Sequence, residues 1–403
     1  MLPRRAQELP PTAGLPLRWT DLLPGAATLA SDLAVQLGTP PLQLECSGTA
    51  CLLIALATLR ELQPQRRYVV VPAYTCPLVA IAVRQAGLEL QLCDLTAGHY
   101  DMDPVALRAA CDERTLAIIP THLAGRVADV GDALDVARKV GAYVIEDAAQ
   151  ALGARRGGVS VGLAGDIGFF SLAAGKGLSI YEGGLLLAHD PALRARLTET
   201  AARIVPRRYG WECRRSIELL GYAALYRPRG LRQAYGKPLR RHLRQGDPVA
   251  AVGDEFALTI PLHRVGRWRQ AVGAHAATRL PNFLEQLTRQ AQRRLPRLHR
   301  INGVKVMQDP TGAEGTWPFL LLLLPDQACR DRALEQLWQS GFGVSRLFIH
   351  ALPDYVYLAD IVPQQDVPHA RDLASRSLSI SNSPWMTDDD FEMICRTLQA
   401  MPG

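Results

Sequence analysis

The feature that most restricts the fold is an alternation of short apolar runs with segments of helical spacing, between about residues 45 and 190. The runs are rich in aliphatic residues, and the segments between them repeat apolar residues every three or four positions. The strand-like runs are 67–74, 88–95, 114–122, 142–150, 165–172 and 183–190. Strands that alternate with helices of this size indicate an α/β domain, in which helices cover both faces of a mostly parallel sheet.

Polar residues follow several of these apolar runs. Tyr74, His122, Asp147 and Ser171 each stand where a predicted strand ends. The carboxyl ends of parallel strands share one edge of the sheet, and functional groups gather beyond that edge. We therefore expect these four side chains to share one site.

The length of the chain allows one large domain and one smaller domain. The 403 residues are 48% apolar and 21% charged, which is enough apolar material for a sizeable core. After about residue 255 the pattern changes to helix, strand, helix, strand and a last helix, for which Thr387 is the expected N-cap. We predict a large domain over residues 1–250, which includes an N-terminal extension and a basic segment at about 203–245. A smaller α+β domain is predicted over residues 251–403.

Composition also disfavours several classes of protein. The longest apolar runs are much shorter than the roughly 20 residues of a membrane-spanning helix, and the early arginines are not followed by the apolar run of a secretory signal. The eight cysteines are scattered without a C-x-x-C pair, which indicates free thiols and no zinc site. We therefore predict a cytoplasmic protein without a bound metal.

Positive charge is concentrated in one segment. Twelve Lys or Arg residues and two acidic residues lie between Arg203 and Arg244, in a chain whose net charge is +6. A solvated basic surface is one interpretation. Attraction of a diphosphate-bearing substrate and attraction to an anionic membrane surface are two others. Nucleic acid is not expected as a partner, because no nucleic-acid-binding motif accompanies the charge.

Two motifs are typical of sites that hold a charged ligand. Ser47, Gly48 and Thr49 precede an apolar helix, whose first N–H groups are able to bind a phosphate. An ordinary helix cap would use the same residues. Asp147 ends a buried strand, and a buried carboxylate needs a partner. A protonated aromatic ring nitrogen is one such partner, and a helix cap or an internal salt bridge would be another.

Lys176 stands between two glycines, in a turn that follows an apolar strand. The glycines let the backbone turn sharply and approach a ligand closely. A solvated loop lysine is the simplest interpretation, but a lysine in a desolvated site has a lowered pKa and acts as a nucleophilic amine. Together with Asp147, Ser171 and the helix start at 47–49, Lys176 fits pyridoxal phosphate (PLP) as a cofactor. The serines and the helix start would hold its phosphate, Asp147 its ring nitrogen and Lys176 its aldehyde carbon.

In this order, the motifs resemble those of the DegT/StrS family of PLP-dependent sugar aminotransferases, which have fold type I. The matching segments are SGTA (47–50), VPAYTCPLVAIAVRQAGLELQLCDL (71–95), PTHLAGRVAD (120–129), IEDAAQALGA (145–154), GDIGFFSLAAGKGLSIYEGG (165–184) and SPWMTDDDFEMICRTL (383–398). The resemblance implies that Asp147 pairs with the pyridinium nitrogen and that Gln150 binds the ring hydroxyl. It also implies that Ser171 and the Gly48–Thr49 turn bind the phosphate, and that Lys176 forms the Schiff base.

The chain departs from the family pattern at several positions. Cys76 stands where many members have an aromatic residue that stacks on the cofactor, a role for which Tyr74 is a candidate. The run LAAGK replaces H-P-T-K before the lysine. We do not recognise the asparagine-containing segment with which a neighbouring subunit usually reaches the phosphate, and arginines of the basic segment are candidates to replace it.

Further site residues are predicted with packing roles as alternatives. Tyr74, Cys76 and His122 are expected to contact the cofactor, and Tyr181 and His350 are expected to contact the substrate. His122, Tyr181 and His350 would serve equally well as packing residues.

The resemblance implies an aminotransferase that moves an amino group, from glutamate, to a keto-sugar carried on a nucleotide, for polysaccharide or glycoside biosynthesis. It also implies a homodimer with active sites at the subunit interface. One alternative is a PLP enzyme acting on another ketone, such as a cyclitol. Another is a catalytically weak PLP-binding regulatory or scaffold protein, docked to a membrane through the basic segment. Lys176 argues against a sugar deoxygenation, because deoxygenating relatives have a histidine in its place.

Overall fold

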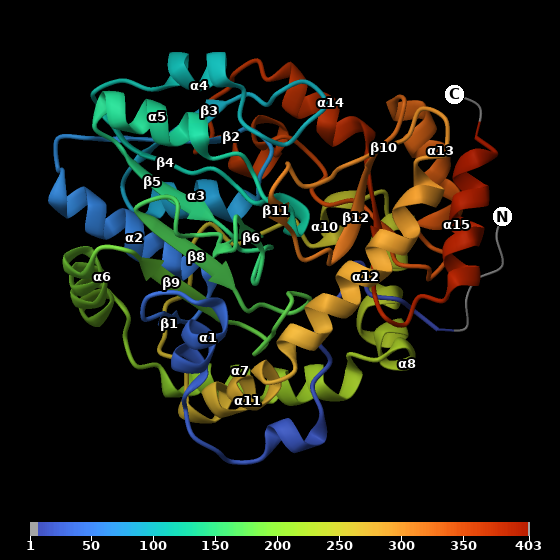
Figure 1. Cartoon of the computed structure of the whole chain (residues 1–403), viewed down its shortest axis with the longest axis horizontal. Helices are drawn as coiled ribbons and strands as arrows, with labels where there is room; N and C mark the ends of the chain where they lie inside the picture. Colours follow the sequence, from blue (N-terminus) through green and yellow to red (C-terminus); the bar gives the residue numbers. More distant parts are fainter. Residues whose placement is uncertain (1–6, 402–403) are drawn as a thin grey trace.

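A seven-stranded sheet forms the centre of the larger part of the computed structural model, which describes residues 7–401 (Figure 1). The strand order is β1-β9-β8-β5-β4-β2-β3. The strands are β1 (Gln43–Glu45), β2 (Tyr68–Pro72), β3 (Glu89–Cys93), β4 (Thr115–Ile118), β5 (Tyr143–Asp147), β8 (Ile167–Ser171) and β9 (Gly184–Ala188). From β3 to β8 all neighbours are parallel, whereas β9 is antiparallel to both β8 and β1. The prediction of a mostly parallel sheet is confirmed.

Helices cover this sheet on both faces. They are α1 (Leu29–Leu37), α2 (Gly48–Leu62), α3 (Pro77–Gln85), α4 (Pro104–Ala110), α5 (Gly131–Val140) and α6 (Pro191–Ile204). Val70 belongs to the core cluster that includes residues of α4 and α5, whereas Val69 and Val71 belong to the cluster that includes residues of α2 and α3. This division follows from the strand itself, since successive side chains of a strand point to opposite faces. Figure 1 shows α4 and α5 side by side along one face.

A second, antiparallel sheet lies beside the first, with the order β10-β12-β14-β13. Its strands are β10 (Lys305–Val306), β12 (Phe319–Leu323), β13 (Val344–Ser345) and β14 (Ser377–Ser381), and its helices are α13 (Gln327–Leu337), α14 (Pro368–Arg376) and α15 (Asp388–Gln399). Thr387 caps α15 as predicted, because its Oγ1 accepts a hydrogen bond of 3.1 Å from the N–H of Asp390. A small third sheet joins β6 (Arg155–Arg156), β7 (Val159–Ser160) and β11 (Ala313–Glu314).

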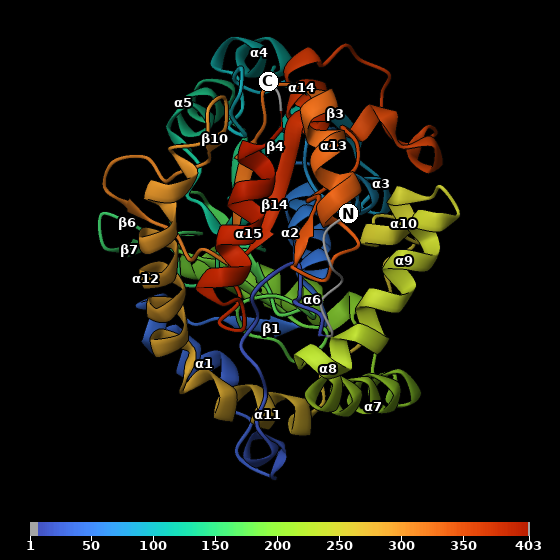
Figure 2. The same cartoon turned by 90° about the vertical axis from the view of Figure 1, so that its right-hand side faces the viewer.

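The basic segment folds as a series of helices that rise along one side of the molecule (Figure 2). They are α7 (Tyr209–Leu225), α8 (Pro228–Leu231), a π-helix (Arg232–Gly236), α9 (Lys237–Arg244) and α10 (Pro248–Val252). Part of the positive charge is neutralised, since Arg214 pairs with Glu218 at 3.0 Å and Arg240 pairs with Glu8 at 2.8 Å. A membrane contact through this segment stays a prediction.

Two further helices, α11 (Arg267–Ala277) and α12 (Leu280–Leu298), connect the basic segment to the second sheet. Because α11 packs against α1 while α12 contributes to the core of the second sheet, this connection touches both parts of the molecule. The proposed domain boundary at residue 250 stays a prediction.

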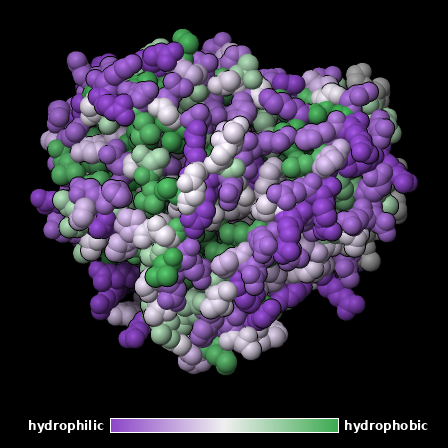
Figure 3. All heavy atoms as spheres, in the orientation of Figure 1, coloured by the Kyte–Doolittle hydropathy of each residue, from purple (hydrophilic) through white to green (hydrophobic). Residues whose placement is uncertain are grey.

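The face of the molecule that Figure 3 shows is mostly hydrophilic. Hydrophobic atoms are exposed there in small groups. Among residues 7–401, no helix is both long and apolar enough to span a membrane. The charged start of the chain, which entered the prediction about secretory signals, lies outside the described residues.

Candidate active site

The N-terminus of α2 lies directly against the end of β8. Ser47 caps the helix, since its Oγ accepts a hydrogen bond of 3.0 Å from the N–H of Ala50. The N–H groups of Gly48 and Thr49 occupy the first two helical positions, where a helix offers no internal acceptor. A Cβ on Gly48 would lie 3.1 Å from the Cβ of Ser171, so the glycine lets the two segments approach closely. Free N–H groups and the Ser171 hydroxyl thus share one small space that suits a phosphate.

Asp147 is the last residue of β5 and is buried, with 4% of its surface exposed. Its Oδ1 accepts a hydrogen bond of 3.0 Å from the N–H of Ala149. Burial raises the pKa of the Asp147 carboxyl, while the Ala149 N–H and the charge of Lys176 oppose that rise. One backbone N–H does not satisfy a buried carboxylate, so this group is suited to a protonated partner from a ligand.

The loop after β8 presents Lys176 to the same space. The N–H of Lys176 donates to the carbonyl of Ala173 at 3.2 Å, and Gly175 has a φ of +78°, a conformation that favours glycine. Burial lowers the pKa of the Lys176 amine, against the opposing influence of Cys76 and Asp147. In the described part of the chain, no carboxylate lies within ion-pair distance of this amine. Lys176 is therefore a desolvated amine that readily gives up its proton.

A cavity of about 630 Å³ contains most of the predicted site residues. Those that line it are Ser47, Gly48, Thr49, Cys76, Asp147, Gln150, Ser171 and Lys176. The volume is in the usual range for a site that holds a cofactor and a small substrate. The structure thus brings together residues that are up to 129 positions apart in the sequence.

The polar atoms around this cavity fit PLP. Gln150 Oε1 accepts a hydrogen bond of 2.8 Å from the N–H of Ala124, which leaves the amide NH₂ of Gln150 as a donor for a ring hydroxyl. The N–H groups at the start of α2 suit the phosphate, and the Asp147 carboxylate suits a protonated ring nitrogen. Burial raises the pKa of the Cys76 thiol to about 12, so Cys76 is a neutral neighbour of these groups.

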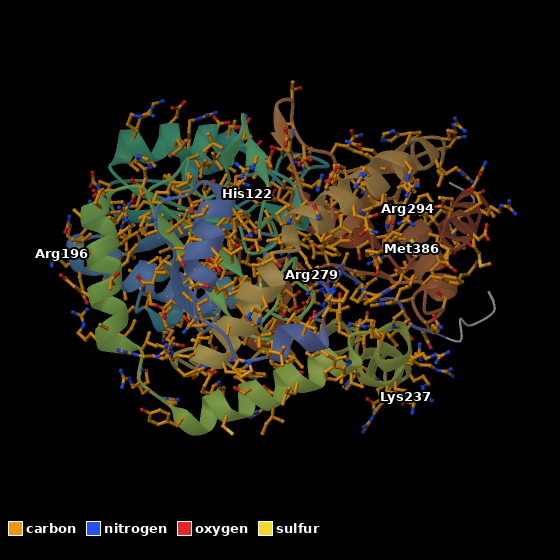
Figure 4. The ribbon with its side chains drawn as sticks, turned by 60° about the horizontal axis from the view of Figure 1, so that its bottom comes forward. His122, Arg196, Lys237, Arg279, Arg294 and Met386 are labelled. Atoms are coloured by element: carbon orange, nitrogen blue, oxygen red, sulfur yellow. The ribbon has the colours of Figure 1, made fainter. Side chains whose placement is uncertain are left out.

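Tyr74 and His122 do not belong to the lining of this cavity, contrary to the prediction. The Tyr74 hydroxyl is engaged with the backbone of Phe348, both N–H and carbonyl lying 3.2 Å away. His122 lies in the interior (Figure 4), where its Nε2 is 2.9 Å from Glu146 and its Nδ1 accepts from the N–H of Ala128 at 3.0 Å. Both ring nitrogens of His122 are therefore used by the protein itself.

Tyr181 and His350, the predicted substrate contacts, also lie outside the lining. The Tyr181 ring meets Tyr222 edge-on at 6.4 Å, and the His350 ring meets Tyr355 edge-on at 5.2 Å. Their positions in the sequence are close to the site, but packing turns both rings toward other aromatic side chains. These two substrate contacts are therefore not supported.

The structure adds site residues that the sequence pattern does not reveal. Glu182 and Arg215 pair with each other at the cavity, and Arg215 is the one Lys or Arg of the basic segment in its lining. Asp254 and Arg346 line it from farther along the chain. Only Glu182 carries a sequence signal, its closeness to Lys176. The other three lie at least 39 positions from Lys176, and no motif surrounds them.

An N-terminal arm, residues 8–15, crosses the lysine loop and joins it to the second sheet. The N–H of Leu15 donates to the carbonyl of Gly177 at 3.0 Å, and the N–H of Ala13 donates to the carbonyl of Pro318 at 2.8 Å. The Thr12 hydroxyl donates to the carbonyl of Gly175 at 2.8 Å and lines the cavity. The arm therefore helps to fix the backbone on both sides of Lys176.

A model of the DegT/DnrJ/EryC1/StrS aminotransferase family matches residues 24–222 and 263–399. The chain belongs to this family. Its membership confirms the resemblance predicted from the motifs, together with fold type I and PLP as the cofactor. The family model does not extend over residues 223–262, which follow α7 and contribute Asp254 to the cavity.

Individual relatives agree with this assignment. The UDP-N-acetyl-3-dehydro-α-D-glucosamine 3-aminotransferase of Acidithiobacillus ferrooxidans is 36% identical over 45% of this chain and 53% of its own length. The L-glutamine:scyllo-inosose aminotransferase of Streptomyces griseus is 39% identical over 40% of this chain and 38% of its own length. The chain thus spans about half the length, or less, of these two relatives. A putative sugar aminotransferase of Streptococcus pneumoniae, solved in its PMP form, shares the fold with a TM-score of 0.75, 16% identity and coverage of 98% and 97% of the two chains.

Proposed function

We propose that this protein is a PLP-dependent transaminase that moves an amino group from glutamate to a ketone on a nucleotide-linked sugar. The observation that carries the proposal is the buried Lys176 amine, which lines one cavity together with the buried Asp147 carboxylate and the free N-terminus of α2. A lysine without a carboxylate partner is costly to bury, so its position needs a chemical reason.

The composition of the chain strengthens this argument. The chain contains 45 Lys and Arg residues, of which only Lys139, Lys176, Lys237 and Lys305 are lysines. Lys139, Lys237 and Lys305 are exposed, and Figure 4 shows Lys237 at the outer edge of the molecule. Arginine stays protonated in proteins and cannot serve as a nucleophilic amine. The one lysine that is not exposed, Lys176, is half-buried and lines the cavity, where a free amine has a use.

The residues of the site have distinct tasks in this proposal. The N–H groups of Gly48 and Thr49 and the hydroxyl of Ser171 would hold the phosphate, and Asp147 would keep the ring nitrogen protonated. Bound PLP supplies the electron sink that permits removal of a proton from the α-carbon of the amino donor. Lys176 Nζ would anchor the cofactor at its aldehyde carbon and, once released, carry that proton as a general base and then as an acid.

The environment of Lys176 suits proton transfer near neutral pH. Burial lowers the pKa of its amine toward the range in which a general base works best. Cys76 and Asp147 oppose this lowering without reversing it. The N-terminal arm, the second sheet and α2 surround the cavity, which limits the access of water to the reacting groups.

The relatives support two classes of ketone. The relative from Acidithiobacillus ferrooxidans is named for a nucleotide-linked keto-sugar, and the relative from Streptomyces griseus is named for scyllo-inosose, a cyclitol ketone. We place the nucleotide-linked sugar first, because the relative named for such a sugar matches 45% of this chain and the relative named for a cyclitol matches 40%. A cytoplasmic homodimer with active sites at its interface completes the proposal.

Borohydride trapping tests the covalent role of Lys176. Reduction of the protein loaded with PLP should attach the cofactor to the peptide that contains Lys176, and L-glutamate should bleach the absorbance of the unreduced protein. The Lys176→Ala variant should bind PLP without covalent trapping, whereas the exposed control Lys139→Ala should behave like the parent. Label on an exposed lysine in place of Lys176 would contradict the assignment. Trapping at Lys176 without bleaching by any amino donor would favour the regulatory alternative.

A further inference from the structure

A further cation, Arg346, lines the cavity from the second sheet, in addition to Lys176 and Arg215. It follows β13, and its Nη2 donates to two backbone carbonyls, those of Ile349 at 2.7 Å and Ala374 at 2.8 Å. Its Nε is buried without a hydrogen-bond partner. The two carbonyls fix the direction of the side chain but carry no net charge. The guanidinium is thus held in place at the cavity, and the described residues place no carboxylate within ion-pair distance of it, although Asp331 and Asp254 act on it from farther away.

Other arginines of the interior have an ion pair or an aromatic ring as a partner. Arg126 pairs with Asp309 at 2.6 Å, and Arg269 pairs with Glu212 at 2.6 Å. Arg294 has no ion pair among the described residues, but it lies over the ring of Phe391 and away from the cavity. Within residues 7–401, Arg346 has neither a carboxylate within ion-pair distance nor an aromatic ring beneath it. A buried charge of this kind is costly unless a partner arrives from outside.

The acidic residues near Arg346 are committed to other groups. Asp331 lies 2.8 Å from the guanidinium of Arg330, a second buried cation beside Arg346. Asp254 Oδ2 accepts hydrogen bonds from the Tyr355 hydroxyl at 2.7 Å and the Ile349 N–H at 2.9 Å. Burial, and then the charge of Arg330, lower the pKa of Arg346 to about 10, as expected where positive charge is in excess. Arg346 remains protonated at neutral pH.

Hydroxyl groups share the lining of the cavity with this cation. Ser345 precedes it, and Ser379 is the residue opposite Ser345 in the pairing of β13 with β14. Tyr235, which hydrogen-bonds Ser345, enters the lining from the π-helix of the segment that the family model does not match. π-helical turns are rare and frequent at functional sites. Three hydroxyls that share a lining with this guanidinium form a set of donors for an oxyanion.

We propose that Arg346, with Ser379 and Tyr235, forms an oxyanion subsite of the active-site cavity. This proposal rests on the proposed function. The ligand of the subsite would be an oxyanion of a substrate, either a carboxylate of the amino donor or a phosphate oxygen of the nucleotide-linked substrate. A substrate anion would form the ion pair with Arg346 that no carboxylate among the described residues forms. The subsite would orient the substrate in the cavity that holds Lys176, and Arg346 is in this sense a binding residue.

The test uses the protein loaded with PLP and the variant Arg346→Gln. Loss of a charge-assisted contact to a bound anion corresponds to about a tenfold to hundredfold loss of affinity. One arm measures the concentration of L-glutamate that half-bleaches the cofactor absorbance, and the other measures the affinity for UDP by equilibrium dialysis. A rise of this size in the glutamate arm identifies a carboxylate ligand, and a rise in the UDP arm identifies a phosphate. Unchanged values in both arms would overturn the proposal.

Controls separate binding from folding and from the proposed function. The exposed Arg371→Gln, outside the cavity lining, should leave both arms unchanged, and Arg346→Lys should recover part of the affinity because it restores the charge. Ser379→Ala should cause a smaller loss in the same arm, and it keeps the test available if Arg346→Gln does not fold. If glutamate fails to bleach the parent while Arg346→Gln weakens UDP binding, the proposed donor is wrong and the subsite stands.

Discussion

Replacing Gly14 with alanine should disturb the lysine loop directly. Gly14 lies in the N-terminal arm, and a Cβ at this position would be 2.8 Å from the carbonyl oxygen of Lys176 and 3.1 Å from the hydroxyl of Tyr226. Contacts of a Cβ below 3.0 Å essentially never occur in proteins, and the nearest atom here is backbone. Either the arm or the lysine loop therefore has to move.

The magnitude follows from the hydrogen bonds that hold the arm. The N–H of Gly14 donates to the Tyr226 hydroxyl at 2.8 Å, and the N–H of Leu15 donates to the carbonyl of Gly177 at 3.0 Å. Each bond contributes about 1 kcal/mol, so losing both lowers the free energy of unfolding by about 2 kcal/mol. Since a misplacement of about 1 Å costs roughly a hundredfold in rate, the half-reaction with the amino donor should slow by up to that factor.

Urea unfolding and stopped-flow bleaching of the cofactor by glutamate measure the two effects. Gly221→Ala is a matched control on α7, because a Cβ there meets no heavy atom within 4 Å. That control should raise stability by about 1 kcal/mol through helix propensity and leave the half-reaction unchanged. If Gly14→Ala unfolds at the same urea concentration as the parent and reacts at the same rate, the arm does not support the position of Lys176.

Three further substitutions probe other parts of the molecule. Burial raises the pKa of Asp254 to about 6. The protonated carboxyl therefore stabilises the folded protein below about pH 4, and this contribution is lost as the pH rises through 6. Asp254→Asn should remove this loss, worth up to about 3 kcal/mol, when urea midpoints are compared at pH 4.5 and pH 8. Ser47→Ala removes the cap of α2, so it should lower the free energy of unfolding by about 1 kcal/mol and also lower the affinity for PLP, measured by cofactor titration. Thr387→Ala removes the cap of α15 and should lower the free energy of unfolding by a similar amount without loss of PLP affinity. Arg269→Met leaves Glu212 without its partner and should cost about 3–5 kcal/mol in urea unfolding, part of which Glu212→Gln in the same chain should recover.

The large sheet is predictable from the sequence because its signals are local. Six of its seven strands coincide with short apolar runs of the sequence, whereas β1, with the sequence QLE, has no such signal. Asp147 and Lys176 are predictable for the same reason, since Asp147 ends the strand β5 and Lys176 lies in the loop that follows the strand β8. The parallel order of the strands then brings them to one edge, as the structure confirms.

The rest of the site depends on contacts that no local pattern encodes. Tyr74 and His122 stand at strand ends, yet their side chains are taken up by Phe348 and Glu146, which lie 274 and 24 positions away. Position at a strand end predicts the edge of the sheet but not the direction of a side chain. Arg346 is hidden for a related reason, because one arginine in a chain with 45 Lys and Arg residues carries no signal until its neighbours are known.

Lys176 and Arg346, two of the three basic residues that line the cavity, show how the chain divides its basic residues between two tasks. Burial lowers the pKa of both Lys176 and Arg346, but the consequence differs because their ordinary values differ. Burial favours the neutral form of the lysine amine, which is able to accept a proton, while an arginine with a pKa of about 10 keeps its charge at neutral pH. An arginine at 176 would defeat the first task, since it could not give up its proton. A chain that uses arginine at nearly every basic position therefore has reason to keep a lysine at 176.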